Sequence, residues 1–222
     1  MTGAGRGIGR AIAVALAARA YDVALLGRTE AELAETAKDI EAKNQRALPI
    51  CCDVSVSTEI AAAAERVARE LGAPGVVVNN AGVVRRASVV SMTEADWDLV
   101  LDTNLKGPFL VARAFLPAML ANKQGRIIAI GSISGTLGTK DQSAYSASKW
   151  GLIGFTKSLA AELVGTGLQT MCVMPGSVDT LMLEGSGFAP EMTAEDVARL
   201  VVYAALDAPA QMNGSAMEMF GS

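Results

Sequence analysis

The stretch Thr2-Gly-Ala-Gly-Arg-Gly-Ile-Gly9 decides how the rest of this chain is interpreted. Its four glycines within eight residues predict a tight turn whose backbone amides can approach a ligand closely. A helical pattern starts near Ile8, and the N–H groups and dipole of that helix would suit a pyrophosphate. Glycine clusters also form ordinary tight turns, so the motif alone is a weak signal. The elements that follow it supply the context.

Outward from this turn, short apolar runs alternate with longer stretches of helical spacing. The runs are Asp22–Leu26, Ala47–Cys51, Gly75–Val78, Arg126–Ile130, Leu168–Val173 and Ser215–Phe220. The helical stretches are Ile8–Arg19, Glu30–Lys43, Ser57–Leu71, Thr93–Ala121, Ser143–Val164 and Thr193–Leu206. Nearly continuous apolar strands between helices predict an α/β fold with a parallel sheet covered on both faces. Right-handed crossovers make that sheet doubly wound, and without repeats or linkers residues 1–222 are expected to form a single domain.

No apolar run precedes the glycine turn. In a doubly wound sheet the first strand is central and aims this turn at its ligand. We therefore expect a gap near the middle of the sheet, with backbone groups and apolar surface exposed there. Weakened folding and weakened ligand binding would follow from such a gap.

The composition excludes several classes of protein. The net charge is −4 with the charges scattered, so no nucleic-acid partner is expected. No apolar run approaches the length of a membrane span, and no signal peptide is recognisable. The chain has no histidine, which excludes histidine-based triads and histidine metal sites. The cysteines Cys51, Cys52 and Cys172 show no disulfide spacing and indicate buried thiols in a reducing, cytoplasmic compartment.

The residue after the strand Asp22–Leu26 bears on the choice of dinucleotide. An acidic side chain there would bind the ribose 2′-hydroxyl of NAD(H). Here Gly27 is followed by Arg28, and Arg6 lies within the glycine turn. Two guanidiniums without a nearby carboxylate suit a 2′-phosphate, so NADP(H) is favoured over NAD(H), the alternative being solvated surface arginines. Asp53 could accept a hydrogen bond from the adenine amino group or cap the next helix.

Tyr145 and Lys149 are four residues apart on one predicted helix and share a face. A free phenol stays protonated at neutral pH, but a nearby ammonium favours the phenolate. Such a tyrosine can protonate a carbonyl oxygen as hydride arrives, or take the alcohol proton in reverse. Ser132, just past a predicted strand, could hold the same oxygen. Asn104, within the long helical stretch, could bend that helix or hold a water.

Together these residues resemble the short-chain dehydrogenase/reductase family. The resemblance is carried by T-G-A-G-R-G-I-G at Thr2–Gly9, N-N-A-G at Asn79–Gly82, Asn104, Ser132, Y-S-A-S-K at Tyr145–Lys149 and P-G-S-V-D-T at Pro175–Thr180. It implies a Rossmann-like fold, a nicotinamide cofactor and a homotetramer or homodimer formed through the stretches Thr93–Ala121 and Ser143–Val164.

The resemblance also implies roles for single residues. Tyr145 would be the general acid/base, Ser132 would stabilise the substrate oxygen, Lys149 would bind the nicotinamide ribose and support the phenolate, and Asn104 would hold the water of a proton relay. No metal ligand is expected. The residues expected to contact the cofactor are Gly3, Gly5, Arg6, Gly7, Ile8, Arg28, Asp53, Val54, Asn80, Ala81, Gly82, Tyr145, Lys149, Pro175, Gly176, Val178 and Thr180.

The family places a mobile substrate lid after Thr180, and here that segment, residues 181–192, is short. Its apolar members would either line a pocket or pack the lid down: Leu181, Met182, Leu183 and Phe188. A short lid would leave the site open to a large or carrier-attached substrate. Arg85 and Arg86 would lie near the mouth, either attracting an anionic group or simply solvated.

These features predict an NADP(H)-dependent oxidoreductase that transfers hydride between nicotinamide and a carbonyl or secondary alcohol. A 3-oxoacyl thioester, as in 3-oxoacyl-[acyl-carrier-protein] reductases, is the first substrate class to consider. An alcohol or sugar dehydrogenase working oxidatively is one alternative. A non-catalytic NADP(H)-binding regulatory protein is another, although it would have no need of the four catalytic side chains.

Overall fold

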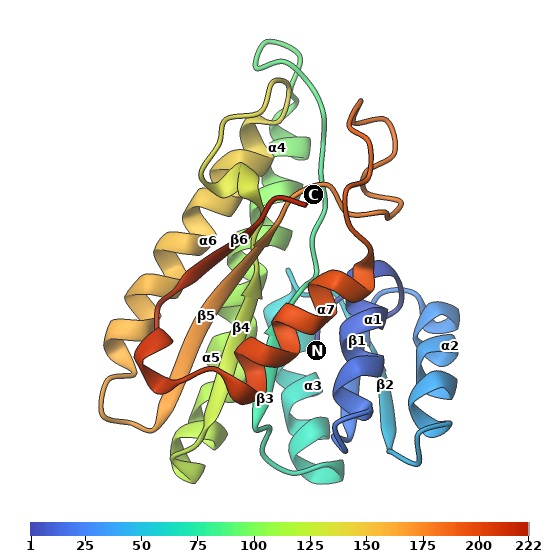
Figure 1. Cartoon of the computed structure of the whole chain (residues 1–222), viewed down its shortest axis with the longest axis vertical. Helices are drawn as coiled ribbons and strands as arrows, with labels where there is room; N and C mark the ends of the chain where they lie inside the picture. The colour runs from blue at the N-terminus through green and yellow to red at the C-terminus, as the bar shows by residue number, and fades with distance from the viewer. Residues whose placement is uncertain (222) are drawn as a thin grey trace.

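The computed structural model describes residues 1–221 and contains six strands, all paired in parallel (Figure 1). The strands are β1 (Val23–Gly27), β2 (Ala47–Cys51), β3 (Val76–Asn79), β4 (Gly125–Ile130), β5 (Leu168–Pro175) and β6 (Ala216–Met219). They form a two-stranded sheet in the order β1-β2 and a four-stranded sheet in the order β3-β4-β5-β6. The predicted parallel α/β architecture is therefore confirmed.

Helices cover both faces of the strands. They are α1 (Gly7–Ala17), α2 (Glu30–Glu41), α3 (Ser57–Glu70), α4 (Glu94–Leu101), α5 (Gly107–Asn122), α6 (Ser143–Glu162) and α7 (Ala194–Val202). Successive strand residues face opposite cores: Val78 packs with α1, α2 and α7, whereas Val77 packs with α3, α5 and α6. Because both faces are covered, both residues are buried, which explains the unbroken apolar runs in the sequence.

The central strand is absent from the described residues, and only Met1 and Thr2 lie between β1 and β3. The backbone N–H of Leu26 donates to the carbonyl of Met1 at 2.9 Å, and the N–H of Thr2 donates to the carbonyl of Val78 at 3.0 Å. These contacts join the two sheets at their carboxyl edge, the edge from which the glycine turn leaves. Farther along, β1 and β3 share no ladder within residues 1–221.

The expected exposure of apolar side chains at this gap is largely wrong. On β1 and β3, Val23, Val77 and Val78 are all less than 6% exposed, and only Ala24 and Val76 are intermediate. The reason is that the helices of the two outer layers still cover these side chains. The gap therefore lies in the backbone hydrogen bonding of the sheet rather than in its apolar packing.

The long helical stretch expected over Thr93–Ala121 is three segments. Helix α4 ends at Leu101, a π-helical segment η1 follows over Asp102–Lys106, and α5 begins at Gly107. Asn104 lies in the π-helical segment, where the wider turn accommodates an extra residue. The prediction of one helix was wrong because apolar spacing does not register a single wide turn.

Candidate active site

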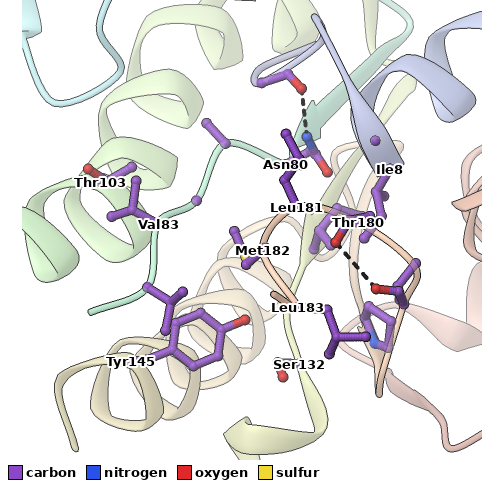
Figure 2. A pocket seen from close by; sticks show the side chains of 18 of the residues that line it. Ile8, Asn80, Val83, Thr103, Ser132, Tyr145, Thr180, Leu181, Met182 and Leu183 are labelled. Carbon is purple, nitrogen blue, oxygen red and sulfur yellow. Dashed lines mark hydrogen bonds between the residues drawn. The ribbon is translucent and has the colours of Figure 1, made fainter. Parts of the chain in front are cut away.

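The carboxyl ends of the strands open into one cavity of about 1110 Å³ (Figure 2). Loops that follow β1 to β5 line it, which is where a ligand is expected in an open parallel sheet. Every residue predicted to contact the cofactor lines this cavity, and so do Tyr145, Lys149 and Ser132. Asn104 does not line it and is fully buried behind it. The folded chain thus brings together motifs from its whole length.

Polar side chains from other elements fix the shape of the glycine turn. The Thr36 hydroxyl, on α2, donates to the carbonyl of Ala4 at 3.0 Å, and the Asn80 amide donates to the carbonyl of Gly3 at 3.0 Å. A Cβ on Gly9 would lie 1.9 Å from the Gly3 carbonyl oxygen, so only glycine allows α1 to approach the turn. No side chain caps α1, which leaves its N-terminal amides available to an anion.

The two arginines expected at a 2′-phosphate each have a carboxylate partner, contrary to the prediction that none is near. Arg6 pairs with Glu32 at 3.2 Å, and Arg28 lies 3.9 Å from Asp53. The sequence pattern missed these partners because Glu32 lies on the next helix and Asp53 follows the neighbouring strand. The two arginine side chains are 64% and 60% exposed. Exposed pairs of this kind contribute about 0–1 kcal/mol, so a bound anion can compete for either guanidinium.

Asp53 does not cap α3, so that alternative is wrong. Its carboxylate accepts hydrogen bonds from the backbone N–H and the hydroxyl of Ser55, at 2.8 and 2.7 Å. Burial by itself would raise the pKa of Asp53, but the bonds from Ser55 and the charge of Arg28 outweigh it, and the pKa lies below its ordinary value. The carboxylate is therefore ionised at neutral pH and lines the cavity as an acceptor.

The three candidate catalytic side chains come from two elements. Tyr145 and Lys149 lie on α6, and the Lys149 ammonium is 5.5 Å from the centre of the Tyr145 ring. Lys149 is 4% exposed and donates to the carbonyl of Ile130 at 2.8 Å. Ser132, at the end of β4, accepts a hydrogen bond from the N–H of Ser134 at 3.1 Å. Figure 2 shows the Tyr145 hydroxyl directed into the cavity, where Ser132 also lies.

Asn104 joins three elements behind these residues. Its side-chain oxygen accepts from the N–H of Val83 at 2.8 Å, and its amide donates to the carbonyl of Val83 at 2.9 Å and to the hydroxyl of Ser148 at 3.1 Å. Ser148 in turn donates to the carbonyl of Tyr145 at 2.7 Å. Both N–H groups of the Asn104 amide, and one acceptor position of its oxygen, are thus used by protein groups. The sequence analysis did not single out Ser148, although its spacing of three residues from Tyr145 could have identified it.

The segment expected to form the lid, residues 181–192, begins beside the part of the cavity where the nicotinamide is expected to bind. Its apolar side chains line the cavity yet remain open to solvent: Leu181 is 60% exposed, Met182 40% and Phe188 57%. These three side chains therefore do not pack the segment down, whereas Leu183 is half-buried. They add apolar surface to the cavity that also contains Tyr145, and Figure 2 shows Leu181 and Met182 of this set.

Among residues 1–221, no group of three or more cysteine, aspartate or glutamate side chains is placed to hold a metal ion. Within the same residues, none of the helices combines the length and the apolar character needed to cross a membrane.

Comparison with known proteins gives consistent relatives. A family model described as short chain dehydrogenase matches residues 1–189. The chain is 35% identical over 234 residues to the 3-oxoacyl-[acyl-carrier-protein] reductase FabG of Escherichia coli (strain K12), covering 100% of this chain and 94% of that protein. It is 40% identical over 179 residues to the protein of the same name from Staphylococcus aureus (strain Mu50), covering 80% and 73%. A solved structure of a short-chain type dehydrogenase/reductase from Mycobacterium marinum superposes with a TM-score of 0.94 at 30% identity, covering 100% and 92%.

Proposed function

This chain belongs to the short chain dehydrogenase family and is an NAD(P)-dependent oxidoreductase of carbonyl and CH–OH groups, and from that premise we propose that it reduces the keto group of 3-oxoacyl thioesters with NADPH. The observation that carries this proposal is that Tyr145, Ser132 and Lys149 share one cavity with the glycine turn. The uncapped amides of α1 fit a pyrophosphate there, so a dinucleotide can extend from the turn toward Tyr145.

Each of the three side chains keeps a hydrogen-bonding capacity that its protein contacts leave unused. Ser132 accepts from Ser134, so its own O–H can donate to the substrate carbonyl oxygen. Lys149 uses one N–H on Ile130 and has two more for ribose hydroxyls, and its ammonium lies 5.5 Å from the centre of the Tyr145 ring. Bound nicotinamide supplies the hydride to the carbonyl carbon. Tyr145 donates its proton to the carbonyl oxygen, which leaves a secondary alcohol.

The preference for NADPH over NADH rests on Arg6 and Arg28. Both guanidiniums border the cavity and are held only by exposed ion pairs, so a dianionic 2′-phosphate can replace Glu32 and Asp53 as their partner. We expect Arg28→Ala to weaken NADPH binding about tenfold or more and to leave NADH binding nearly unchanged.

The matched controls are Glu32→Gln and Asp53→Asn. Each frees one guanidinium without removing it, so each is expected to tighten NADPH relative to NADH. A wild-type protein that binds NADH more tightly than NADPH would refute the preference. Fluorescence titration of both reduced cofactors measures all of these affinities.

The substrate class is supported by the lid and by the names of the relatives. Leu181, Met182 and Phe188 offer apolar surface to an acyl chain, whereas a sugar would need polar partners. Two relatives, one from Escherichia coli and one from Staphylococcus aureus, match most of this chain. Both are named as 3-oxoacyl-[acyl-carrier-protein] reductases. The exposed side chains of this short segment leave the cavity accessible to a substrate that remains attached to a carrier.

The test follows the loss of NADPH absorbance with a short 3-oxoacyl thioester. Tyr145→Phe is expected to lower turnover by at least about a hundredfold while NADPH binding persists, because only the transferred proton is removed. Tyr203→Phe, an exposed tyrosine outside the cavity, is the matched control. Unchanged turnover in Tyr145→Phe would refute the mechanism. Oxidation of alcohols or sugars without reduction of the thioester would favour the oxidative alternative, and absence of any turnover would favour a non-catalytic role.

Assembly as a homodimer or homotetramer in the cytoplasm is also part of the proposal. Exposed aromatic side chains on α4, α5 and α6 support it: Trp97 is 39% exposed, Phe109 43% and Trp150 55%. Apolar side chains of this size on neighbouring helices suit burial between subunits. Analytical ultracentrifugation of the wild type and of Trp150→Lys measures the state, and a wild-type monomer would refute this part.

A further inference from the structure

Arg86 connects the loop after β3 to the tip of the lid. Its guanidinium donates to the carbonyl of Met182 at 2.8 Å and to the carbonyl of Glu184 at 3.2 Å. The base of Arg86 is itself fixed, because the N–H of the next residue, Ala87, donates to the carbonyl of Asp141 at 2.9 Å. Arg86 thus bridges a fixed loop and a segment nearly a hundred residues further along the chain.

Backbone hydrogen bonds hold the two ends of the lid. The N–H of Glu191 donates to the carbonyl of Ser177, and the N–H of Asp179 donates to the carbonyl of Met192, both at 2.9 Å. Between these two ends lies the lid tip, residues 181–188. Within the described chain, the hydrogen bonds that tie this tip to other elements come from Arg86 alone.

Packing does little to hold the lid tip. Its apolar side chains Leu181, Met182 and Phe188 are between 40% and 60% exposed. Internal turns shape the tip without attaching it, since the N–H of Leu183 donates to the carbonyl of Thr180. The two bonds from Arg86 carry the full charge of a guanidinium, which makes them stronger than neutral hydrogen bonds.

The neighbouring arginine has a different partner. Arg85 pairs with Asp96 on α4 at 3.0 Å, away from the lid. Arg86 forms no ion pair among residues 1–221, so its charge is directed at the lid carbonyls. Two adjacent arginines at the mouth of the cavity therefore differ in what they hold.

We propose that Arg86 is the latch of the lid and that it sets the preference of the site for apolar acyl chains. With the latch closed, Met182 and Leu183 line the same cavity as Tyr145, where they can contact an acyl chain (Figure 2). Arg86 is a positioning residue, since it acts through the lid rather than on the reacting atoms. The effect on substrate rests on the proposed function, whereas the latch itself does not.

Hydrogen exchange measured by mass spectrometry tests the latch without any substrate. In Arg86→Ala we expect the amides of Leu183 and Ser186 to exchange about tenfold faster than in the wild type, because the tip loses its attachment. Arg85→Ala is the matched control and should leave the lid unchanged. Arg86→Lys, which keeps the charge but not the two-pronged donor, should fall between. Equal lid exchange in Arg86→Ala and the wild type would overturn the latch.

Kinetics then test the consequence for specificity. Arg86→Ala is expected to raise KM about tenfold for a long-chain 3-oxoacyl thioester, to raise it less for a short one, and to change kcat little. An equal effect on both chain lengths, or an equal effect in Arg85→Ala, would overturn the specificity role. A wild type that reduces no 3-oxoacyl thioester would refute the proposed function, while the exchange experiment would still decide the latch.

Discussion

The ammonium of Lys149 donates a hydrogen bond of 2.8 Å to the carbonyl oxygen of Ile130, the last residue of β4. This bond fixes a nearly buried cation at the carboxyl edge of the sheet, 5.5 Å from the Tyr145 ring. No carboxylate among residues 1–221 pairs with it, so its charge is left to act on what enters the cavity. The strand, rather than a counter-ion, positions this lysine.

Replacing Lys149 with methionine keeps much of the aliphatic side chain and removes the charge. We expect turnover of a ketone to fall by about 10²–10⁴, because proton transfer from Tyr145 loses the nearby positive charge that offsets the negative charge developing on its oxygen. NADPH should also bind more weakly, because ribose donors are lost. Lys157→Met, an exposed lysine on the same helix, is the control. Turnover within about threefold of the wild type in Lys149→Met would contradict the assigned role.

The sequence predicted the elements that carry a strong apolar period. The run Ala47–Cys51 coincides with β2, and the stretch from Ser143 onward coincides with α6, because burial on a helix-covered sheet leaves a clear pattern. Tyr145, Lys149 and Ser132 could be placed at one edge for the same reason, since parallel strands end together. Their shared edge was thus predictable from the order of the elements, whereas their catalytic roles rest on the resemblance to the family.

The remaining features depend on contacts between segments far apart in the chain. The partners of Arg6 and Arg28 were missed because Glu32 and Asp53 approach them only after folding. The π-helical segment around Asn104 leaves no periodic signal, since one wide turn shifts the pattern by a single residue. Long-range pairing and local irregularity are therefore where this sequence was least informative.

Removing the Ser148 hydroxyl tests whether α6 is positioned by Asn104. Ser148→Ala is expected to lower the free energy of unfolding by about 1 kcal/mol or more, because the buried Asn104 amide loses an acceptor. It should also lower kcat more than it weakens the binding of NADPH, because the hydrogen bond to the Tyr145 carbonyl is lost. Ser158→Ala, an exposed serine on α6, is the control. Urea denaturation and steady-state kinetics that match the control would contradict this prediction.

The three cysteines should differ sharply in reactivity. Burial raises the pKa of both Cys52 and Cys172 to about 11, so these thiols stay protonated below that pH. Cys51 is exposed, so the expectation of a buried thiol is wrong at that position. Because the thiolate is the nucleophile, iodoacetamide at pH 8 should modify Cys51 alone in the folded protein and all three cysteines after denaturation. Peptide mapping distinguishes the sites. If Cys52 were modified as fast as Cys51, the Cys52 thiol would be accessible to solvent, which would contradict its burial in the structure.

The gap between β1 and β3 makes a prediction about stability and cofactor binding together. Among the described residues, Met1 and Thr2 alone bridge these strands. Thr2 also accepts hydrogen bonds from the backbone N–H groups of Asn80 and Ala81, so the gap borders the proposed cofactor site. A five-residue segment with valine at alternate positions, placed ahead of Met1, should form a hydrogen-bonded ladder with both β1 and β3. Its valine side chains should be buried between the helical layers. Each buried valine contributes about 1.5 kcal/mol or more before the cost of ordering, so we expect the free energy of unfolding to rise by about 2 kcal/mol and NADPH to bind more tightly. A glycine-serine extension of the same length is the control, because it offers the backbone without the side chains. If the two extensions behave alike in urea denaturation and NADPH titration, apolar burial at the gap limits neither the stability nor the NADPH affinity of this chain. The hydrogen bonds of Met1 and Thr2 would then be sufficient to position the glycine turn.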